Sequence, residues 1–146
     1  MSSLKKYLKR KGFVSIKLSR TQTDHFEVKA ILNGVSGSFI LDTGASNTCV
    51  GLDKAERFGL VSEPTDIKAA GAGSSELEAR ISPKNLFQLG KWKKKKLPVV
   101  LLDLSHVNLA LTSRESEAVD GIIGADVLRK GRAVIDYKKK MLFLKK

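Results

Sequence analysis

Directly behind the apolar run at 39–41 stands the one tetrapeptide whose residue types most readily support catalysis, Asp42, Thr43, Gly44 and Ala45. A carboxylate at the end of a strand can act as a general acid or base, and a glycine beside it lets other groups approach closely. Two carboxylates about 3 Å apart cannot both ionise, so such a pair shares one proton. The chain carries the tetrapeptide once. A pair of these aspartates would therefore need two copies of the chain around a two-fold axis.

Other catalytic patterns find little support in the sequence. His25 and His106 are the two histidines, and neither lies in a ligand-spaced cluster with Cys49. Ser46 and Cys49 have no neighbouring base in a recognisable motif, and a phosphate-binding glycine loop followed by Lys-Ser or Lys-Thr is absent. We therefore expect neither a metal nor another cofactor.

Length and composition predict one ordinary domain. A chain of 146 residues can bury its own core, and its hydrophobic fraction of 42% is unremarkable for a globular protein. The longest apolar stretch, around 97–102, is far shorter than the roughly 20 residues of a membrane span. A single cysteine and the lack of a secretory signal favour a cytoplasmic protein. We expect a basic tail at 1–12 and a single domain at 13–146.

Charge is the one unusual feature of the composition. The formal net charge is +12, and most of it comes from lysine-rich clusters at 5–11, 91–96 and 138–146. A field of that sign attracts nucleic acid, anionic lipid or acidic polypeptide without choosing among them. Solvated turns and tails are the more ordinary interpretation. Trp92 could stack on a base, although a lone aromatic in a strand more often packs on the core. Nonspecific contact with polyanions is left open.

Strand signals dominate the first part of the chain. Alternating apolar and polar residues predict strands at 14–18 and 26–32. The Asn-Gly pair at 33–34 is a strong hairpin signal, and it leads into a third strand at 35–41. That third strand delivers the tetrapeptide at its end.

Further elements follow at intervals typical of an all-β domain. We predict a short helix at 53–58 and a small-residue hairpin tip at 69–75. Two strands are predicted at 86–92 and 97–104, with Pro98 at the start of the second. A loop at 113–119, an apolar turn at 121–124, a helix at 125–130 and strands at 134–137 and 141–144 complete the chain. Asp120 and Asp126 are read as turn and helix-cap residues. Many short strands separated by turn signals predict a mostly β fold, a closed antiparallel β barrel with one or two short helices.

From about residue 26 to residue 144 the chain resembles the retropepsin-like aspartic peptidases, the family of the retroviral proteases and their bacterial single-domain relatives. The family pattern runs from an apolar strand into Asp-Thr-Gly-Ala, then through a glycine-rich flap and a strand pair to an apolar-apolar-Gly turn, a short helix and a final hairpin. Matching parts stand here in that order at 39–46, 71–75, 86–104, 120–128 and 134–144.

The resemblance implies an aspartic endopeptidase that works as a homodimer. Asp42 of each subunit would hold the attacking water and act first as general base and then as general acid. Thr43 would donate its hydroxyl across the dimer axis, and Gly44 would allow close approach. The positions that the resemblance assigns to polypeptide substrate are Ala45, Gly71, Ala72, Gly73, Ile122, Ile123 and Gly124.

Two departures from the retroviral pattern bear on the dimer. Retroviral enzymes resemble this chain less at Ser46 and Ala125, where they carry an aspartate and an arginine that buttress their dimer. Their chain ends also interleave, whereas the ends here are rich in lysine. Like charges crowded at an interface oppose association. A weak homodimer that depends on concentration and salt is expected.

Two alternatives to an active peptidase remain. The same fold could serve as a catalytically silent peptide-binding module, because fold does not fix function. The lysine clusters could instead mark a basic domain associated with nucleic acid.

Overall fold

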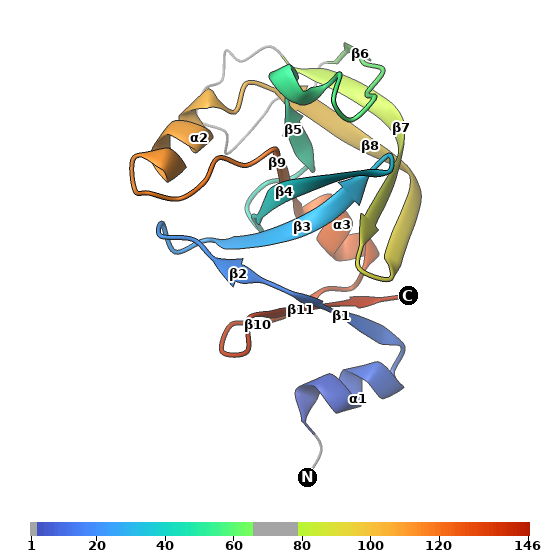
Figure 1. The fold of residues 1–146 in the computed structure, drawn as a ribbon. Coiled ribbons are helices and arrows are strands. Elements are labelled where there is room, and N and C mark those ends of the chain that lie inside the picture. Colours follow the sequence, from blue (N-terminus) through green and yellow to red (C-terminus); the bar gives the residue numbers. More distant parts are fainter. Residues whose placement is uncertain (1–2, 66–78) are drawn as a thin grey trace.

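The structure, a computed structural model, describes residues 3–65 and 79–146 (Figure 1). Its strands form two groups, a large sheet that closes on itself and a smaller sheet made from both ends of the chain. Helices are few and short: α1 (Leu4–Arg10), the 3₁₀ helix η1 (Leu52–Lys54), α2 (Ser105–Thr112) and α3 (Ala125–Lys130). Within the described ranges, no helix is both long and apolar enough to cross a bilayer.

Six strands close the large sheet into a barrel. Around the ring they follow the order β3, β4, β9, β5, β8 and β7, and pairing of β7 with β3 completes it. Their bounds are β3 (Phe26–Leu32), β4 (Val35–Leu41), β5 (Cys49–Gly51), β7 (Arg80–Leu89), β8 (Trp92–Leu102) and β9 (Gly121–Ile123). Only β4–β9 and β5–β8 pair in parallel. The predicted closed, mostly antiparallel β barrel is confirmed. Short strands β2 (Ser19–Arg20) and β6 (Glu63–Pro64) extend it beside β3 and β7.

The barrel is filled by the inward-facing residues of its strands. Along β3, buried Val28, Ala30 and Leu32 alternate with more exposed neighbours, as the period of two requires. Phe39 of β4 and Phe87 of β7 meet edge to face in the interior, with ring centroids 5.7 Å apart. Burial of these apolar side chains is the main force that holds the barrel closed.

Both ends of the chain meet in a separate antiparallel sheet. Strand β11 (Met141–Lys145) lies between β1 (Phe13–Lys17) and β10 (Val134–Asp136), so both of its neighbours belong to the same chain. Helix α1 precedes β1 and buries Leu8, within the segment expected to be a basic tail. Ser3 begins this helix, because its side chain accepts the N–H of Lys6 at 3.2 Å.

Several predicted elements differ in the structure. Residues 121–123 form strand β9 instead of an apolar turn, because they pair with β4 on one side and β5 on the other. The strand predicted to begin at 97 is part of β8, so Pro98 lies inside a strand and not at its start. Pro98 is tolerated there because it lies opposite a register irregularity of β7 and has no partner in the register.

Two helical segments also depart from the sequence prediction. The helix predicted at 53–58 is reduced to η1 and a turn that ends at Gly59, whose φ is +62°. Helix α2 was not predicted. The carboxylate of Asp103 accepts both the hydroxyl and the N–H of Ser105 at its start, the latter at 2.8 Å. These hydrogen bonds, the hydroxyl first, hold the pKa of Asp103 below its ordinary value.

Candidate active site

Asp42 directly follows β4 and is oriented by the backbone around it. Its own N–H donates to the carbonyl of Ile123 at 3.0 Å, which fixes the start of the loop to β9. The N–H of Gly44 donates to Asp42 Oδ1 at 2.9 Å, and the N–H of Ala45 donates to the Asp42 carbonyl at 3.2 Å. Asp42 is half-buried, while Thr43 and Gly44 are exposed. The loop therefore presents a fixed carboxylate at the surface of the single chain.

The loop behind Asp42 crosses the segment after β9 at very short range. The N–H of Ala125 donates to the carbonyl of Ala45 at 2.7 Å. A Cβ added to Gly124 would lie 2.8 Å from Ala45 O and 2.7 Å from the carbonyl carbon of Asn47. Only a residue without a side chain fits between these two backbones.

A side-chain contact that was not predicted from the sequence holds the Asp42 loop against the segment after β9. Asp126 Oδ1 accepts the N–H of Thr48 at 2.9 Å and its hydroxyl at 2.8 Å, and the Thr48 hydroxyl in turn accepts the N–H of Gly124 at 3.1 Å. Gly124 is the N-cap of α3, so Asp126 is not the helix cap that the sequence predicted. Its carboxylate instead ties α3 to the loop that carries Asp42.

The two isoleucines of β9 pack beneath this loop. Ile122 belongs to a buried cluster with Ala45 and Cys49 and is 5% exposed. Ile123 is fully buried in the core of the barrel. Both therefore support the loop in the single chain. The other positions that the resemblance assigned to substrate, Gly71, Ala72 and Gly73, lie outside the described residues.

Cys49 lies under the loop and is unsuited to nucleophilic chemistry. Burial raises the pKa of its thiol to about 12, and the charges of Asp126 and Asp42 act in the same direction. A hydrogen bond with the backbone of Ile122 opposes the shift without cancelling it. Because the thiolate is the reactive form, this cysteine is inert at neutral pH.

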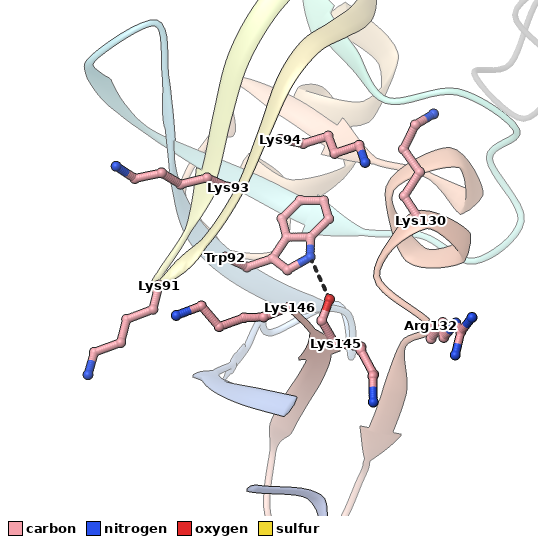
Figure 2. Close-up of a pocket in the computed structure, with 8 residues that line it drawn as sticks. All are labelled: Lys91, Trp92, Lys93, Lys94, Lys130, Arg132, Lys145 and Lys146. Atoms are coloured by element: carbon pink, nitrogen blue, oxygen red, sulfur yellow. Dashed lines mark hydrogen bonds between the residues drawn. The ribbon is translucent and has the colours of Figure 1, made fainter. Parts of the chain in front are cut away.

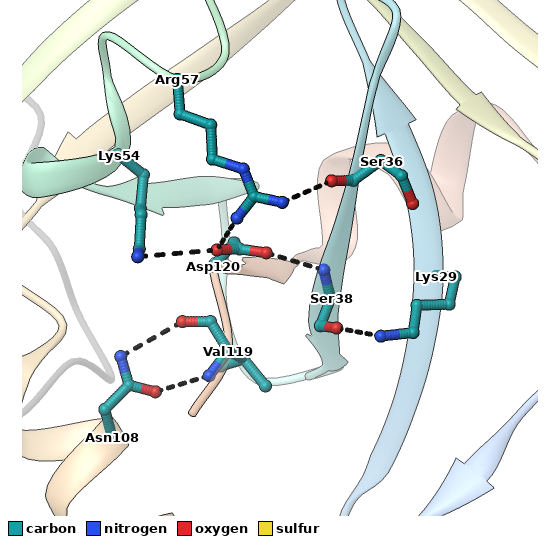
Figure 3. Close-up of polar contacts among 8 residues, drawn as sticks. All are labelled: Lys29, Ser36, Ser38, Lys54, Arg57, Asn108, Val119 and Asp120. Atoms are coloured by element: carbon teal, nitrogen blue, oxygen red, sulfur yellow. Dashed lines mark hydrogen bonds and ion pairs between the residues drawn. The ribbon is translucent and has the colours of Figure 1, made fainter. Parts of the chain in front are cut away.

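Asp120 directly precedes β9 and lies at the centre of a second polar group (Figure 3). Its Oδ1 accepts Arg57 Nη1 at 2.9 Å, and its Oδ2 accepts the N–H of Ser38 at 2.9 Å. The same guanidinium donates to the carbonyl of Ser36 at 2.9 Å, and Lys54 Nζ lies 4.0 Å from the carboxylate. Asp120 stands in a bend directly before β9, consistent with the predicted turn, and at 9% exposed it is also a largely buried ion-pair partner, which the sequence did not predict.

Backbone and amide contacts fix the segment that leads into β9 (Figure 3). The side chain of Asn108 donates to the carbonyl of Val119 at 3.1 Å and accepts the N–H of Val119 at 2.8 Å. The N–H of Asp120 donates to Ser38 O at 2.8 Å, and Asp120 O accepts the N–H of Gly51 at 3.0 Å. Strand β9 therefore enters the barrel at a defined register, directly beside Asp42.

The described parts of the chain, 3–65 and 79–146, contain no recognisable metal site. No group of three His, Cys, Asp or Glu side chains gathers there in a way that could hold an ion. The chemistry that the described site offers is that of a half-buried, backbone-oriented carboxylate.

A model of the aspartyl protease family matches residues 28–127, which is more than half of the chain and includes the Asp42 loop and β9. The chain belongs to this family. No curated protein shows a sequence match to it.

Solved structures of retropepsin-like proteins share the fold. A retropepsin-like aspartic protease from Rickettsia conorii is 20% identical over 91% of this chain and 89% of its own, with a TM-score of 0.57. The retroviral protease-like domain of Ddi1 from Leishmania major is 20% identical over 90% and 89%, with a TM-score of 0.56. The EIAV protease, complexed with the inhibitor HBY-793, is 16% identical over 70% and 84%, with a TM-score of 0.51. The retropepsin-like fold predicted from sequence is thereby shown.

Proposed function

We propose that this aspartyl protease family member is an endopeptidase whose catalytic pair consists of Asp42 from each subunit of a homodimer. The observation that carries the proposal is the Asp42 carboxylate, half-buried at the end of β4 and oriented by the N–H of Gly44 at 2.9 Å. One chain supplies one such loop, and a shared proton needs two. A two-fold axis beside the exposed residues 43 and 44 would bring the second carboxylate into place.

In this mechanism the paired carboxylates hold a water between them. The ionised Asp42 takes a proton from the water as it attacks the peptide carbonyl, and the protonated one donates to the leaving amine. Thr43 would donate its hydroxyl to the partner loop and hold the two carboxylates at the required separation. An extended peptide would lie over Gly44, with Ala45, Ile122 and Gly124 shaping the cleft beneath. The substrate role that the resemblance assigns to residues 71–73 stays a prediction.

The terminal sheet limits the ways in which a homodimer could form. Because β11 is already paired on both sides within its own chain, it cannot interleave with a second copy. The outer edges of β1 and β10 are the strands of this sheet that could add a partner by further pairing. Lysines at 145–146 and 138–140 lie on or beside this sheet. Repulsion between the lysines of two subunits would weaken association at low salt.

The deciding experiment replaces Asp42 by asparagine, which keeps the size and removes the ionisable group. Cleavage of an unfolded casein substrate, measured across pH and protein concentration, is expected in the wild type and to be lost in Asp42→Asn. The control is Asp24→Asn, an exposed aspartate with φ of +70°, a conformation that asparagine tolerates. Activity that survives Asp42→Asn would exclude the carboxylate pair.

The same experiment distinguishes a catalytically silent peptide-binding module from an active peptidase. If the wild type never cleaves but binds extended peptides, and Asp42→Asn binds them equally, the fold serves recognition alone. Rate per subunit should rise with protein concentration for a catalytic homodimer, since only the associated form carries two aspartates. A cytoplasmic location remains a prediction from sequence.

A further inference from the structure

Two adjoining hollows on the surface are rich in cations, the larger almost throughout and the smaller at four of its lining residues, beside glycines, a serine and the apolar Phe13, Val14 and Phe143. The larger, about 660 Å³, is lined by six lysines and Arg132 around the indole of Trp92 (Figure 2). The smaller, about 570 Å³, adds Lys5 and Lys9. Both share Lys91 and Lys146, so we describe them together as the basic groove. No aspartate or glutamate lines either hollow.

The fold gathers these cations from distant parts of the chain and anchors their backbones. Trp92 Nε1 donates to the carbonyl of Lys145 at 3.2 Å, which joins β8 to β11 (Figure 2). The N–H of Lys145 donates to Gly131 O at 2.7 Å, and the N–H of Lys146 donates to Gly12 O at 3.1 Å. Backbone hydrogen bonds of the fold therefore hold the groove in place.

The positive charge of the groove is not neutralised by neighbouring acids among the described residues. Ion pairs there join Arg20 to Asp24, and Lys54 and Arg57 to Asp120, and none includes a cation of the groove. Lys145 Nζ donates to the Lys11 carbonyl at 2.6 Å, which positions this ammonium without cancelling its charge. Concentrated, unpaired charge in a hollow attracts a polyanion.

The chemistry of the groove favours a phosphate backbone over other anionic partners. Lysine ammonium groups are flexible point charges that suit phosphates along a strand but do not read bases. Trp92 is 3% exposed and its N–H is occupied, so it cannot serve as a stacking platform. The large apolar residues that are exposed on the described chain, which could anchor a protein or insert into lipid, line neither hollow, and the apolar residues of the smaller hollow, Phe13, Val14 and Phe143, are half-buried or buried.

We propose that the basic groove binds the sugar–phosphate backbone of a nucleic acid without recognising its base sequence. The proposal does not depend on peptidase activity, and Asp42 has no part in it. Binding of this kind releases counterions, so affinity falls steeply as salt rises. It also tolerates any base, because the contacts reach only phosphate and sugar.

The test compares two variants of equal charge on the full chain. Groove variant Lys91→Gln, Lys93→Gln, Lys146→Gln and control variant Lys95→Gln, Lys138→Gln, Lys139→Gln each lower the net charge from +12 to +9. The control lysines are exposed and line neither hollow. Affinity for labelled 20-mers of thymidine and of adenosine, and for a duplex, is measured by fluorescence anisotropy across salt. Circular dichroism checks that each variant is folded.

We expect the groove variant to lose on the order of 100-fold in affinity for single strands near 0.1 M salt, with the salt slope reduced by about 2. The control variant should bind within about threefold of the wild type, and the two homopolymers should differ little. Equal losses in both variants would mean a diffuse charge effect and would overturn the proposal. Tighter binding to polyglutamate or to phosphatidylserine vesicles than to the oligonucleotides would overturn it equally.

Discussion

Asp126 and Thr48 are joined twice through one oxygen, because Asp126 Oδ1 accepts both the Thr48 N–H at 2.9 Å and the Thr48 hydroxyl at 2.8 Å. The contact links the loop after Asp42 to helix α3. The resemblance to the retroviral enzymes implies a buttressing pair at the positions of Ser46 and Ala125. The contact that joins the two segments in this chain is instead between Thr48 and Asp126.

Replacing Thr48 by valine should destabilise the protein by about 2–3 kcal/mol. The change removes a hydrogen bond to a carboxylate and leaves the buried N–H of Gly124 without its partner. Thr48→Ser keeps the hydroxyl and should cost about 1 kcal/mol, the value of a buried methyl group. Urea unfolding of both variants measures the difference. A loss in Thr48→Ser as large as or larger than that in Thr48→Val would contradict a dominant role of the hydroxyl.

Gly124→Ala should cost about 3 kcal/mol and, under the proposed function, abolish peptide cleavage. The backbone at Gly124 is extended and allows any residue, so the cost is steric, from a Cβ 2.7–2.8 Å from the backbone of 45 and 47. Gly59→Ala is the matched comparison, because its site is open and its φ is +62°. That variant should lose only about 1–2 kcal/mol. Thermal unfolding that ranks them in reverse would contradict the close crossing.

Around Asp120, removal of the acid should cost more than removal of its cation. Asp120→Ala deprives the Ser38 N–H and Arg57 of an acceptor whose side chain is 12% exposed, for a loss of about 2–3 kcal/mol. The Arg57 side chain is 48% exposed, so solvent screens it, and Arg57→Ala should cost about 1 kcal/mol or less. Lys54→Ala should be almost neutral, since its contact is 4.0 Å long. Urea denaturation midpoints of the three variants at low and high salt measure these losses. A larger loss in Arg57→Ala or Lys54→Ala than in Asp120→Ala would contradict the prediction.

The Cys49 thiol should resist modification until the protein unfolds. At pH 8 an aromatic disulfide reagent is expected to react slowly with the native chain and at once in denaturant, because burial disfavours the thiolate. The same burial links stability to pH. The native pKa of about 12 exceeds the ordinary thiol value of 9.0, so this contribution is complete below pH 9 and is lost as pH rises toward 12.

Comparison with Cys49→Ala isolates this pH effect from the titration of lysines. The stability difference between wild type and variant should shrink above pH 9, by at most about 1.4 kcal/mol per pH unit. A difference that stays constant between pH 8 and 11 would argue against a buried neutral thiol.

Salt should strengthen the proposed homodimer. Screening weakens repulsion between two chains that each carry +12, so sedimentation velocity is expected to show more dimer at 0.5 M than at 0.05 M salt. A tight dimer at low salt would contradict the expected weakness. A pepstatin-like inhibitor, which would bind only the paired aspartates, should shift the equilibrium in the same direction.

Much of the barrel could be predicted because its signals are local. Alternation at 26–32, the Asn-Gly turn at 33–34 and the run into Asp42 each depend on residues that are neighbours in sequence. Errors arose where long-range pairing decides the outcome. Residues 121–123 look like a turn between glycines, yet they are a strand because β4 and β5 lie on either side.

Strand period, turn chemistry and motif order depend on neighbouring residues, so the barrel class, the loop that carries Asp42 and its single occurrence could all be predicted from the amino-acid sequence. Which distant groups meet became clear from the folded chain alone. Thr48 and Asp126 are 78 residues apart, and Arg57 and Asp120 are 63 apart. Whether two such side chains touch depends on how the strands cross, and local propensity carries no information about that.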